Sequence, residues 1–147
     1  MLTEEDSSIT TLSIHMARGW PLDGEAYDRQ GRLNPSFVPS DIDIPVAAGE
    51  DHLYVAKLEE GLEKLINNGP PDIALVLAGS DPYEKDELPS TGELKLSLAQ
   101  LKQRDLLVYH FLKAHKVPRA YVTAGGYGER SWEVDWQFIE WALLDNL

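Results

Sequence analysis

The sequence predicts an α/β fold in which a parallel sheet is flanked by helices. Strand and helix signals alternate along the chain, and two short apolar runs at 73–78 and 120–123 are typical of buried strands. A parallel connection between such strands requires a crossover, and the helical pattern between them supplies it. With 147 residues, 43% of them hydrophobic, the chain is long enough for a single domain with a core.

The first part of the chain contains two strand signals separated by a long loop. Residues 9–14 are rich in β-branched side chains, which favours a strand. Residues 16–40 carry Gly, Pro, Asp and Asn with little periodicity, and connections of this length are often functional. Residues 41–45 alternate polar and apolar side chains and are expected to form a short edge strand, because Pro45 cannot donate to a ladder.

Three helices are predicted in the remainder. The first is expected to begin near Asp51 as its N-cap and to end at the Asn-Asn-Gly-Pro-Pro run. The second has a capping box, with Ser97 as N-cap and Gln100 at the third helical position, and runs to about His115. Ser131 is a candidate cap for the last helix. That helix is apolar on more than one face, so we expect most of it to be covered.

Composition excludes several classes of function. The net charge of −12 argues against non-specific binding of nucleic acid and against an anionic membrane surface. The absence of cysteine excludes disulfides and cysteine-ligated zinc, and it fits a reducing compartment. No apolar stretch is long enough to span a bilayer, and the acidic start MLTEEDSS lacks a signal pattern. The sequence therefore predicts a soluble, cytoplasmic protein.

Polar motifs follow the two buried-strand signals. One is Gly79-Ser80-Asp81-Pro82 and the other is Gly125-Gly126-Tyr127. Parallel strands deliver their C-terminal ends to one rim of the sheet, so we expect the two motifs to lie close together. A carboxylate beside a phenol suggests a metal ligand next to a donor for an oxyanion, and paired glycines let the backbone approach a substrate. The spacing alone leaves a purely structural alternative open, in which Asp81 caps a turn and Tyr127 packs into the protein.

Taken in order, the motifs resemble those of the histone deacetylase superfamily, which includes acetylpolyamine amidohydrolases and acetoin-utilisation proteins. The similarity is greatest to the bacterial, class IV-like branch, and it extends over nearly the whole chain. The matching segments are Leu12-Ser13-Ile14-His15, Trp20-Pro21, Asp41-Ile42-Asp43-Ile44-Pro45, Gly79-Ser80-Asp81-Pro82, Asp86, Leu88, Leu94-Lys95-Leu96-Ser97, Arg104-Asp105 and Gly125-Gly126-Tyr127.

The resemblance implies a zinc-dependent amide hydrolase on a partial arginase/deacetylase-type parallel sheet. The superfamily acts on acetylated lysine, polyamines and small acetylated metabolites, all of which share this chemistry. By this match Asp81 corresponds to the third zinc ligand. Tyr127 corresponds to the tyrosine that polarises the acetyl carbonyl, and Trp20 to an aromatic wall of the substrate channel.

Further positions receive roles from the same resemblance. Ser13 and Ile14 match positions that hold a structural potassium ion through oxygen atoms. Gly125 and Gly126 match the glycine run beside the substrate, although the first glycine of that run is Ala124 here. Asp86 matches an acid to which we assign a structural role.

The sequence departs from the superfamily pattern at its histidines. Neither the His-His pair, which supplies the general base, nor the Asp-x-His pair of zinc ligands is present among His15, His52, His110 and His115. Residues 1–147 are therefore expected to be a single domain that resembles the C-terminal half of a deacetylase domain. A catalytic zinc site uses three protein ligands, so we expect little or no activity from this chain alone.

The resemblance also predicts a gap in the sheet. In the superfamily's strand order, the missing Asp-x-His strand lies between the strands matching 9–14 and 72–78. A half-chain must re-pair its edges or accept a strand from a partner, so a homo-oligomer or a complementing N-terminal half is expected.

Three functions stay open on the sequence. The chain is a deacetylase-like fragment with part of a site, or a non-catalytic binding or assembly module derived from the fold. The third is an enzyme of changed chemistry that uses Asp81, Asp86 and Tyr127 with another metal.

Overall fold

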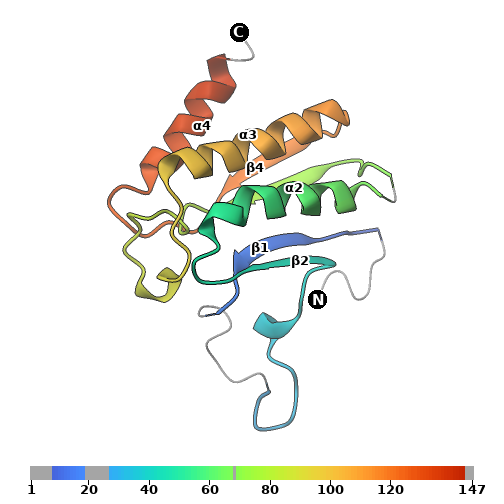
Figure 1. Cartoon of the computed structure of the whole chain (residues 1–147). Coiled ribbons are helices and arrows are strands. Elements are labelled where there is room, and N and C mark those ends of the chain that lie inside the picture. The colour runs from blue at the N-terminus through green and yellow to red at the C-terminus, as the bar shows by residue number, and fades with distance from the viewer. Residues whose placement is uncertain (1–7, 19–26, 68, 145–147) are drawn as a thin grey trace.

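The structure, a computed structural model, describes residues 8–18, 27–67 and 69–144 (Figure 1). Four short strands and three α-helices alternate in it, which confirms the predicted α/β class. Three single turns of 3-10 helix lie in the connections. The strands are β1 (Leu12–Met16), β2 (Ile42–Val46), β3 (Ala74–Ala78) and β4 (Arg119–Thr123).

The helices follow the second, third and fourth strands. Helix α3 begins with the predicted capping box: the Ser97 hydroxyl accepts a hydrogen bond from the Gln100 N–H at 3.3 Å, and the Ser97 N–H donates to Gln100 Oε1 at 3.0 Å. The helices are α2 (Tyr54–Leu65), α3 (Leu98–Ala114) and α4 (Trp132–Leu144).

The four strands form two separate parallel pairs. Strand β1 pairs with β2 from Leu12–Ile42 onward, and β3 pairs with β4 from Ala74–Arg119 onward. Across the described ranges no ladder joins one pair to the other, although β1 lies between β2 and the second pair (Figure 1). The sheet therefore has a break at the position where the resemblance predicts a missing strand.

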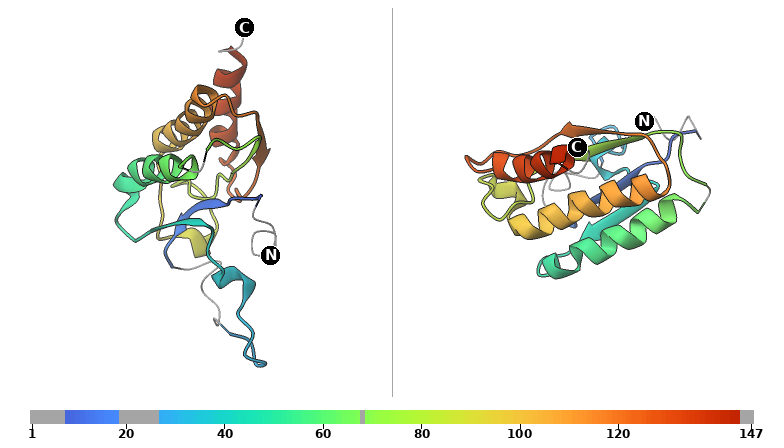
Figure 2. Two further views of the ribbon diagram at one scale, coloured as in Figure 1. Left: turned by 90° about the vertical axis from the view of Figure 1, so that its right-hand side faces the viewer. Right: turned by 90° about the horizontal axis from the view of Figure 1, so that it is seen from above.

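One face of the second pair is uncovered. Leu75 and Leu77 on β3 are 69% and 72% exposed, and Val122 on β4 is also exposed. The prediction that residues 73–78 are buried on both faces is therefore wrong. Helices α2 and α3 lie to one side of the strands (Figure 2), and no element among the described residues covers the other side. One face of this apolar run is therefore left uncovered by the part of the chain that the structure describes.

Two predictions about helices are also wrong. Asp51 does not cap α2, because a 3-10 turn at Asp51–Leu53 precedes the helix and Asp51 Oδ1 accepts the Lys95 N–H at 2.8 Å. Helix α4 is not mostly covered: only Val134 and Phe138 are buried in it. Its exposed apolar side chains are Trp132, Trp136, Ile139, Leu143 and Leu144.

The main core lies beneath the connection between β3 and α3. Tyr83, Leu94 and Leu96 from this connection are buried against β1, β2 and the first turns of the helices. The buried members of the cluster are Met16, Val46, Tyr54, Tyr83, Leu94, Leu96, Leu101 and Val134. The connection is thus anchored by its own side chains, which fixes the loop that carries Asp81 and Asp86.

Candidate functional site at the strand ends

The ends of β3 and β4 meet, as the sequence predicts. The Gly125 carbonyl accepts three hydrogen bonds: from Ser80 N–H at 2.5 Å, from Asp81 N–H at 3.2 Å and from the Ser80 hydroxyl at 3.0 Å. The two polar motifs are therefore joined directly, and the backbone on both sides of Asp81 is fixed.

Glycines make room for the Asp81 carboxylate. A Cβ atom on Gly79 would lie 2.6 Å from Asp81 Oδ1, and one on Gly125 would lie 2.8 Å from Asp81 Cγ. Gly126 has a φ of +155° and its Cβ would run into the Ser80 side chain. Any side chain at these positions would displace the carboxylate or its neighbour, so the glycines create the niche that holds Asp81.

The Asp81 carboxylate is half-buried and electrostatically unfavourable as an anion. Burial raises the pKa of Asp81, and the nearby Asp86 carboxylate raises it further, while Arg104 acts in the opposite direction. A carboxylate in this condition is stabilised by an added cation, which is a property expected of a metal ligand.

Arg104 connects helix α3 to the end of β3. Its Nη1 donates to the Gly79 carbonyl at 2.5 Å, and its Nε donates to Asp105 Oδ1 at 2.8 Å. Both side chains are buried. The sequence marked this pair only as part of a motif. The sequence signal that could have identified this role is a charged pair, Arg104-Asp105, on the face of the helix that is turned toward the core. Such a pair can hold the end of a neighbouring strand.

Asp86 holds the loop that carries Tyr127. Its Oδ2 accepts the Tyr127 N–H at 2.6 Å and the Gly128 N–H at 3.2 Å, and its Oδ1 accepts the Leu88 N–H at 2.9 Å. Burial raises the pKa of Asp86, but these hydrogen bonds and one from Ser131 outweigh it, and the pKa is lowered. This agrees with the structural role assigned to Asp86, because both of its carboxylate oxygens already accept hydrogen bonds.

Tyr127 presents its ring to the surface. Its backbone N–H is fixed by Asp86, yet the residue is 60% exposed. The alternative in which Tyr127 packs into the protein is therefore not supported. Its exposed phenol can instead donate a hydrogen bond to a molecule that approaches from solvent.

Comparison with known proteins places this geometry in a family. The model of the histone deacetylase domain matches residues 1–143. The chain belongs to the histone deacetylase family. Histone deacetylase 2 of Arabidopsis thaliana is 27% identical over 136 residues, which are 92% of this chain and 32% of that protein. An uncharacterized protein of Picosynechococcus sp. is 28% identical over 127 residues, 86% of this chain and 37% of that protein.

The chain spans about a third of the length of these relatives. Deacetylases of this family are generally zinc-dependent, but the donor atoms found here do not fit a zinc site. Within residues 8–18, 27–67 and 69–144, no three His, Cys, Asp or Glu side chains are grouped so that they could hold a metal ion. Asp81 stands as a single carboxylate, whereas a catalytic zinc ion takes three protein ligands.

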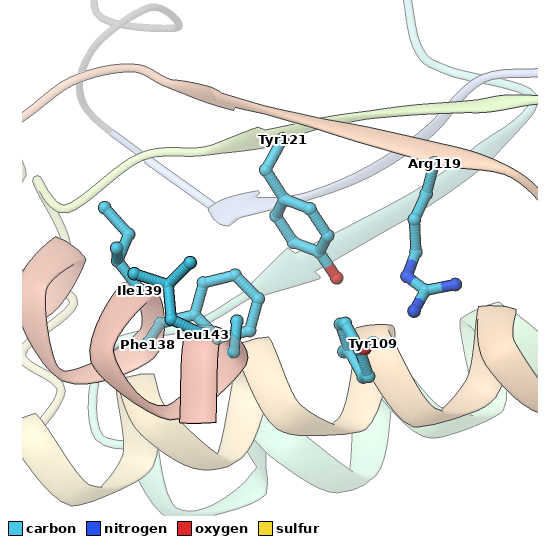
Figure 3. A pocket seen from close by; sticks show the side chains of 7 residues that line it. Tyr109, Arg119, Tyr121, Phe138, Ile139 and Leu143 are labelled. Atoms are coloured by element: carbon cyan, nitrogen blue, oxygen red, sulfur yellow. The ribbon is translucent and has the colours of Figure 1, made fainter. Parts of the chain in front are cut away.

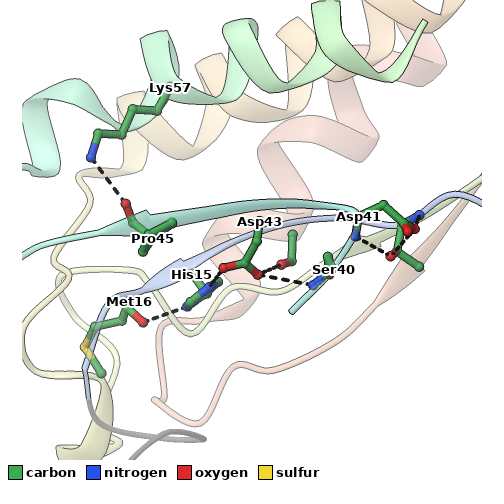
Figure 4. Close-up of polar contacts among 9 residues, drawn as sticks. His15, Met16, Ser40, Asp41, Asp43, Pro45 and Lys57 are labelled. Atoms are coloured by element: carbon green, nitrogen blue, oxygen red, sulfur yellow. Dashed lines mark hydrogen bonds and ion pairs between the residues drawn. The ribbon is translucent and has the colours of Figure 1, made fainter. Parts of the chain in front are cut away.

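Among the described residues, no histidine of this deacetylase-family chain belongs to a group of three ligands that could hold a metal ion. His52 and His110 are both exposed. His115 Nδ1 is 2.9 Å from the Phe111 carbonyl oxygen. His15 lies on β1 and not in a loop, with Nε2 3.3 Å from Asp43 Oδ2 (Figure 4).

The residues predicted to hold a structural ion lie on β1. The Ser13 hydroxyl donates to Asp43 Oδ1 at 3.1 Å, and Ile14 packs against the core. The ion itself stays a prediction. Trp20, the predicted wall of the substrate channel, lies outside the described residues. Among the helices that are described, none is long and apolar enough to cross a membrane.

Proposed function

We propose that this chain supplies one part of a zinc-dependent deacetylase site that acts on acetylated lysine or polyamine-type amides. Asp81 is one ligand of the metal, and Tyr127 is the hydrogen-bond donor to the acyl oxygen. The observation that carries the proposal is the glycine-walled niche in which a half-buried carboxylate lies beside the loop of an exposed tyrosine. Family membership supports the class of reaction.

The role of Tyr127 follows from where negative charge develops. When an amide carbonyl is attacked, charge accumulates on its oxygen, and a positioned O–H donor stabilises that charge more than it stabilises the substrate. The hydrogen bonds from Tyr127 and Gly128 to Asp86 fix the loop in advance, so little reorganisation is needed at the moment of reaction. Gly125 and Gly126 let the acyl group approach the backbone.

Residues 1–147 by themselves are proposed to have little or no deacetylase activity. A general base and two further ligands are needed, and the proposal assigns them to polypeptide outside these residues, on a complementing half or a second copy. The unpaired edges of β1 and β3 and the uncovered Leu75 and Leu77 provide a surface for such a polypeptide. The acidic, cysteine-free composition supports a cytoplasmic location, which is part of the proposal.

Zinc content tests the proposal. The chain is measured after dialysis against trace zinc, alone and after co-expression with the part of the Picosynechococcus relative that lies outside the match. We expect no stoichiometric zinc in the chain alone, and bound zinc in the assembled protein. Asp81→Ala should abolish it, whereas Asp72→Ala, which removes an exposed acid, should retain it.

Hydrolysis of an acetyl-lysine peptide by the assembled protein then tests Tyr127. Tyr127→Phe should lower the rate by roughly 10²–10³-fold with zinc content unchanged, as for loss of one oxyanion donor. Zinc that binds equally well in Asp81→Ala would contradict the assignment of the ligand.

A second candidate is a non-catalytic binding or assembly module derived from the deacetylase fold. The broad exposed apolar surface on β3, β4 and α4 favours it, since such surfaces mark interaction sites. An assembled protein that forms a stable complex but contains no zinc would select this function over the first.

A further inference from the structure

A cavity of about 370 Å³ lies between β4 and the helices α3 and α4 (Figure 3). Its size falls within the range of about 300–1,000 Å³ that is usual for small-molecule sites. The walls are aromatic and aliphatic, and the exposed side chains of Ile139 and Leu143 lie on α4 at its margin. The cavity adjoins Arg119 and Tyr121 in β4, whereas the Asp81 niche adjoins Gly125 beyond the end of that strand.

Two polar atoms at this cavity are buried without a partner. Arg119 Nε and the Tyr121 hydroxyl have no hydrogen-bond partner in the part of the chain that the structure describes. Figure 3 shows the Tyr121 hydroxyl and the Arg119 guanidinium on the same side of β4, above Tyr109. Buried donors that lack acceptors lower the stability of a fold, and native proteins retain few of them. An acceptor that occupies the cavity would satisfy both.

Arg119 is the one charged side chain among the described residues that line the cavity, in a chain of net charge −12. The Arg119 guanidinium lies 3.9 Å from the centroid of the Tyr109 ring, and Lys113 Nζ lies 5.5 Å from the same centroid. Within the described residues, Arg119 takes part in no ion pair. A guanidinium and a phenol that both donate are suited to the two oxygens of a carboxylate.

We propose that this cavity binds a monocarboxylate with an apolar body of about the size of a medium-chain fatty acid. Arg119 and Tyr121 hold the carboxylate, and the hydrocarbon lies along Phe138, Ile139 and Leu143. This site is independent of the proposed deacetylase site and uses none of its residues.

Calorimetric titration with octanoate tests the proposal, with octanol as the uncharged probe of the same length. Octanoate should bind with a stoichiometry of one, and octanol at least about tenfold more weakly, because it lacks the charged partner of Arg119. Arg119→Gln should weaken octanoate by about tenfold or more. Lys64→Gln, which removes an exposed charge on α2, should leave the affinity unchanged.

Tyr121→Phe provides a variant that is expected to fold. It removes only the unpartnered hydroxyl, so its melting temperature should not fall, while octanoate should bind several-fold more weakly. The proposal is overturned if octanoate does not bind the wild-type chain, if octanol binds equally well, or if Tyr121→Phe binds like wild type. It is also overturned if NMR shifts on titration occur at Leu75 and Leu77 and not at Tyr121 and Phe138.

Discussion

Two aspartates on one loop, Asp81 and Asp86, have opposite electrostatic environments. Asp86 accepts backbone and hydroxyl hydrogen bonds and is stabilised as an anion. Asp81 lies in a niche walled by Gly79 and Gly125, where burial raises its pKa. The first residue is therefore stabilised as an anion, whereas the second is an unfavourable anion, which is compatible with its proposed role as a metal ligand.

Asp81→Asn should stabilise the chain at neutral pH. Because burial raises the pKa of Asp81 above its ordinary value of 3.8, the folded state binds this proton more tightly than the unfolded state. The contribution of Asp81 to stability is thus greatest below the ordinary pKa and is lost as the pH rises through the folded pKa. The gain in Asp81→Asn should be small at pH 4 and larger at pH 7, measured by urea unfolding at both pH values.

Asp86→Asn is the matched comparison and should act in the opposite direction. The pKa of Asp86 is lowered in the folded state, so its contribution is present above the ordinary value and is lost as the pH falls through the folded pKa. Its loss should reduce the free energy of unfolding at pH 7 by about 1–3 kcal/mol, since hydrogen bonds to a buried anion are removed. If both variants shift stability in the same direction, the contrast between the two environments is incorrect.

At the level of helices and strands, local sequence signals correctly predicted the features that are determined by residues close together in the sequence. The Ser97 capping box and the parallel pairing of β3 with β4 were anticipated because their determinants lie within each segment or its composition. The prediction of Asp51 as the N-cap of α2 was wrong because its carboxylate accepts the N–H of Lys95. Lys95 is distant in the sequence, and capping rules consider only residues close to the helix start. The burial of β3 and α4 was overestimated. An apolar composition indicates that a face is suited to burial, but it does not identify the polypeptide that covers the face.

Leu77→Thr should leave the stability of the isolated chain almost unchanged. The side chain is 72% exposed on β3, so its replacement removes little burial and should change the free energy of unfolding by no more than about 0.5 kcal/mol. Leu96→Ala is the comparison, because Leu96 is fully buried in the core and its truncation should cost about 2–5 kcal/mol. Urea unfolding measures both, at a protein concentration below that of self-association, so that only the monomer is compared. A large loss in Leu77→Thr would show that the face is covered within this chain.

For the molecule as a whole, the break between the two sheets is the main departure from a closed domain. Sequence patterns placed the strands and the site loops, and the meeting of Ser80 and Asp81 with Gly125 confirms the predicted rim. The position of the break came only from the family resemblance, since strand order in a sheet is set by long-range packing. Arg104 and its contact with Gly79 were not anticipated for the same reason.

The isolated chain is expected to self-associate at micromolar concentration. Leu75, Leu77 and Val122 form an exposed apolar face beside unpaired strand edges, and such surfaces favour association. Sedimentation equilibrium should show a dimer or larger species, and the double variant Leu75→Lys, Leu77→Lys should shift it toward monomer. A wild-type chain that sediments as a monomer would contradict this expectation.

The separation of the two sheets has a consequence for how the chain acquires its structure. Pairing of Leu12 with Ile42 and of Ala74 with Arg119 requires long segments to close before any ladder forms, which makes nucleation slow. Because the two pairs share no strand among the described residues, neither pair templates the other. Cooperativity then depends on the contact of α2 with α3 and on the core, in which Tyr83 and Leu96 join Met16 and Val46. During synthesis, the strand edges of each pair are therefore expected to stay exposed until the slow pairing step is complete. A chaperone, or a strand of another polypeptide that covers these edges early, would then determine the yield of native protein.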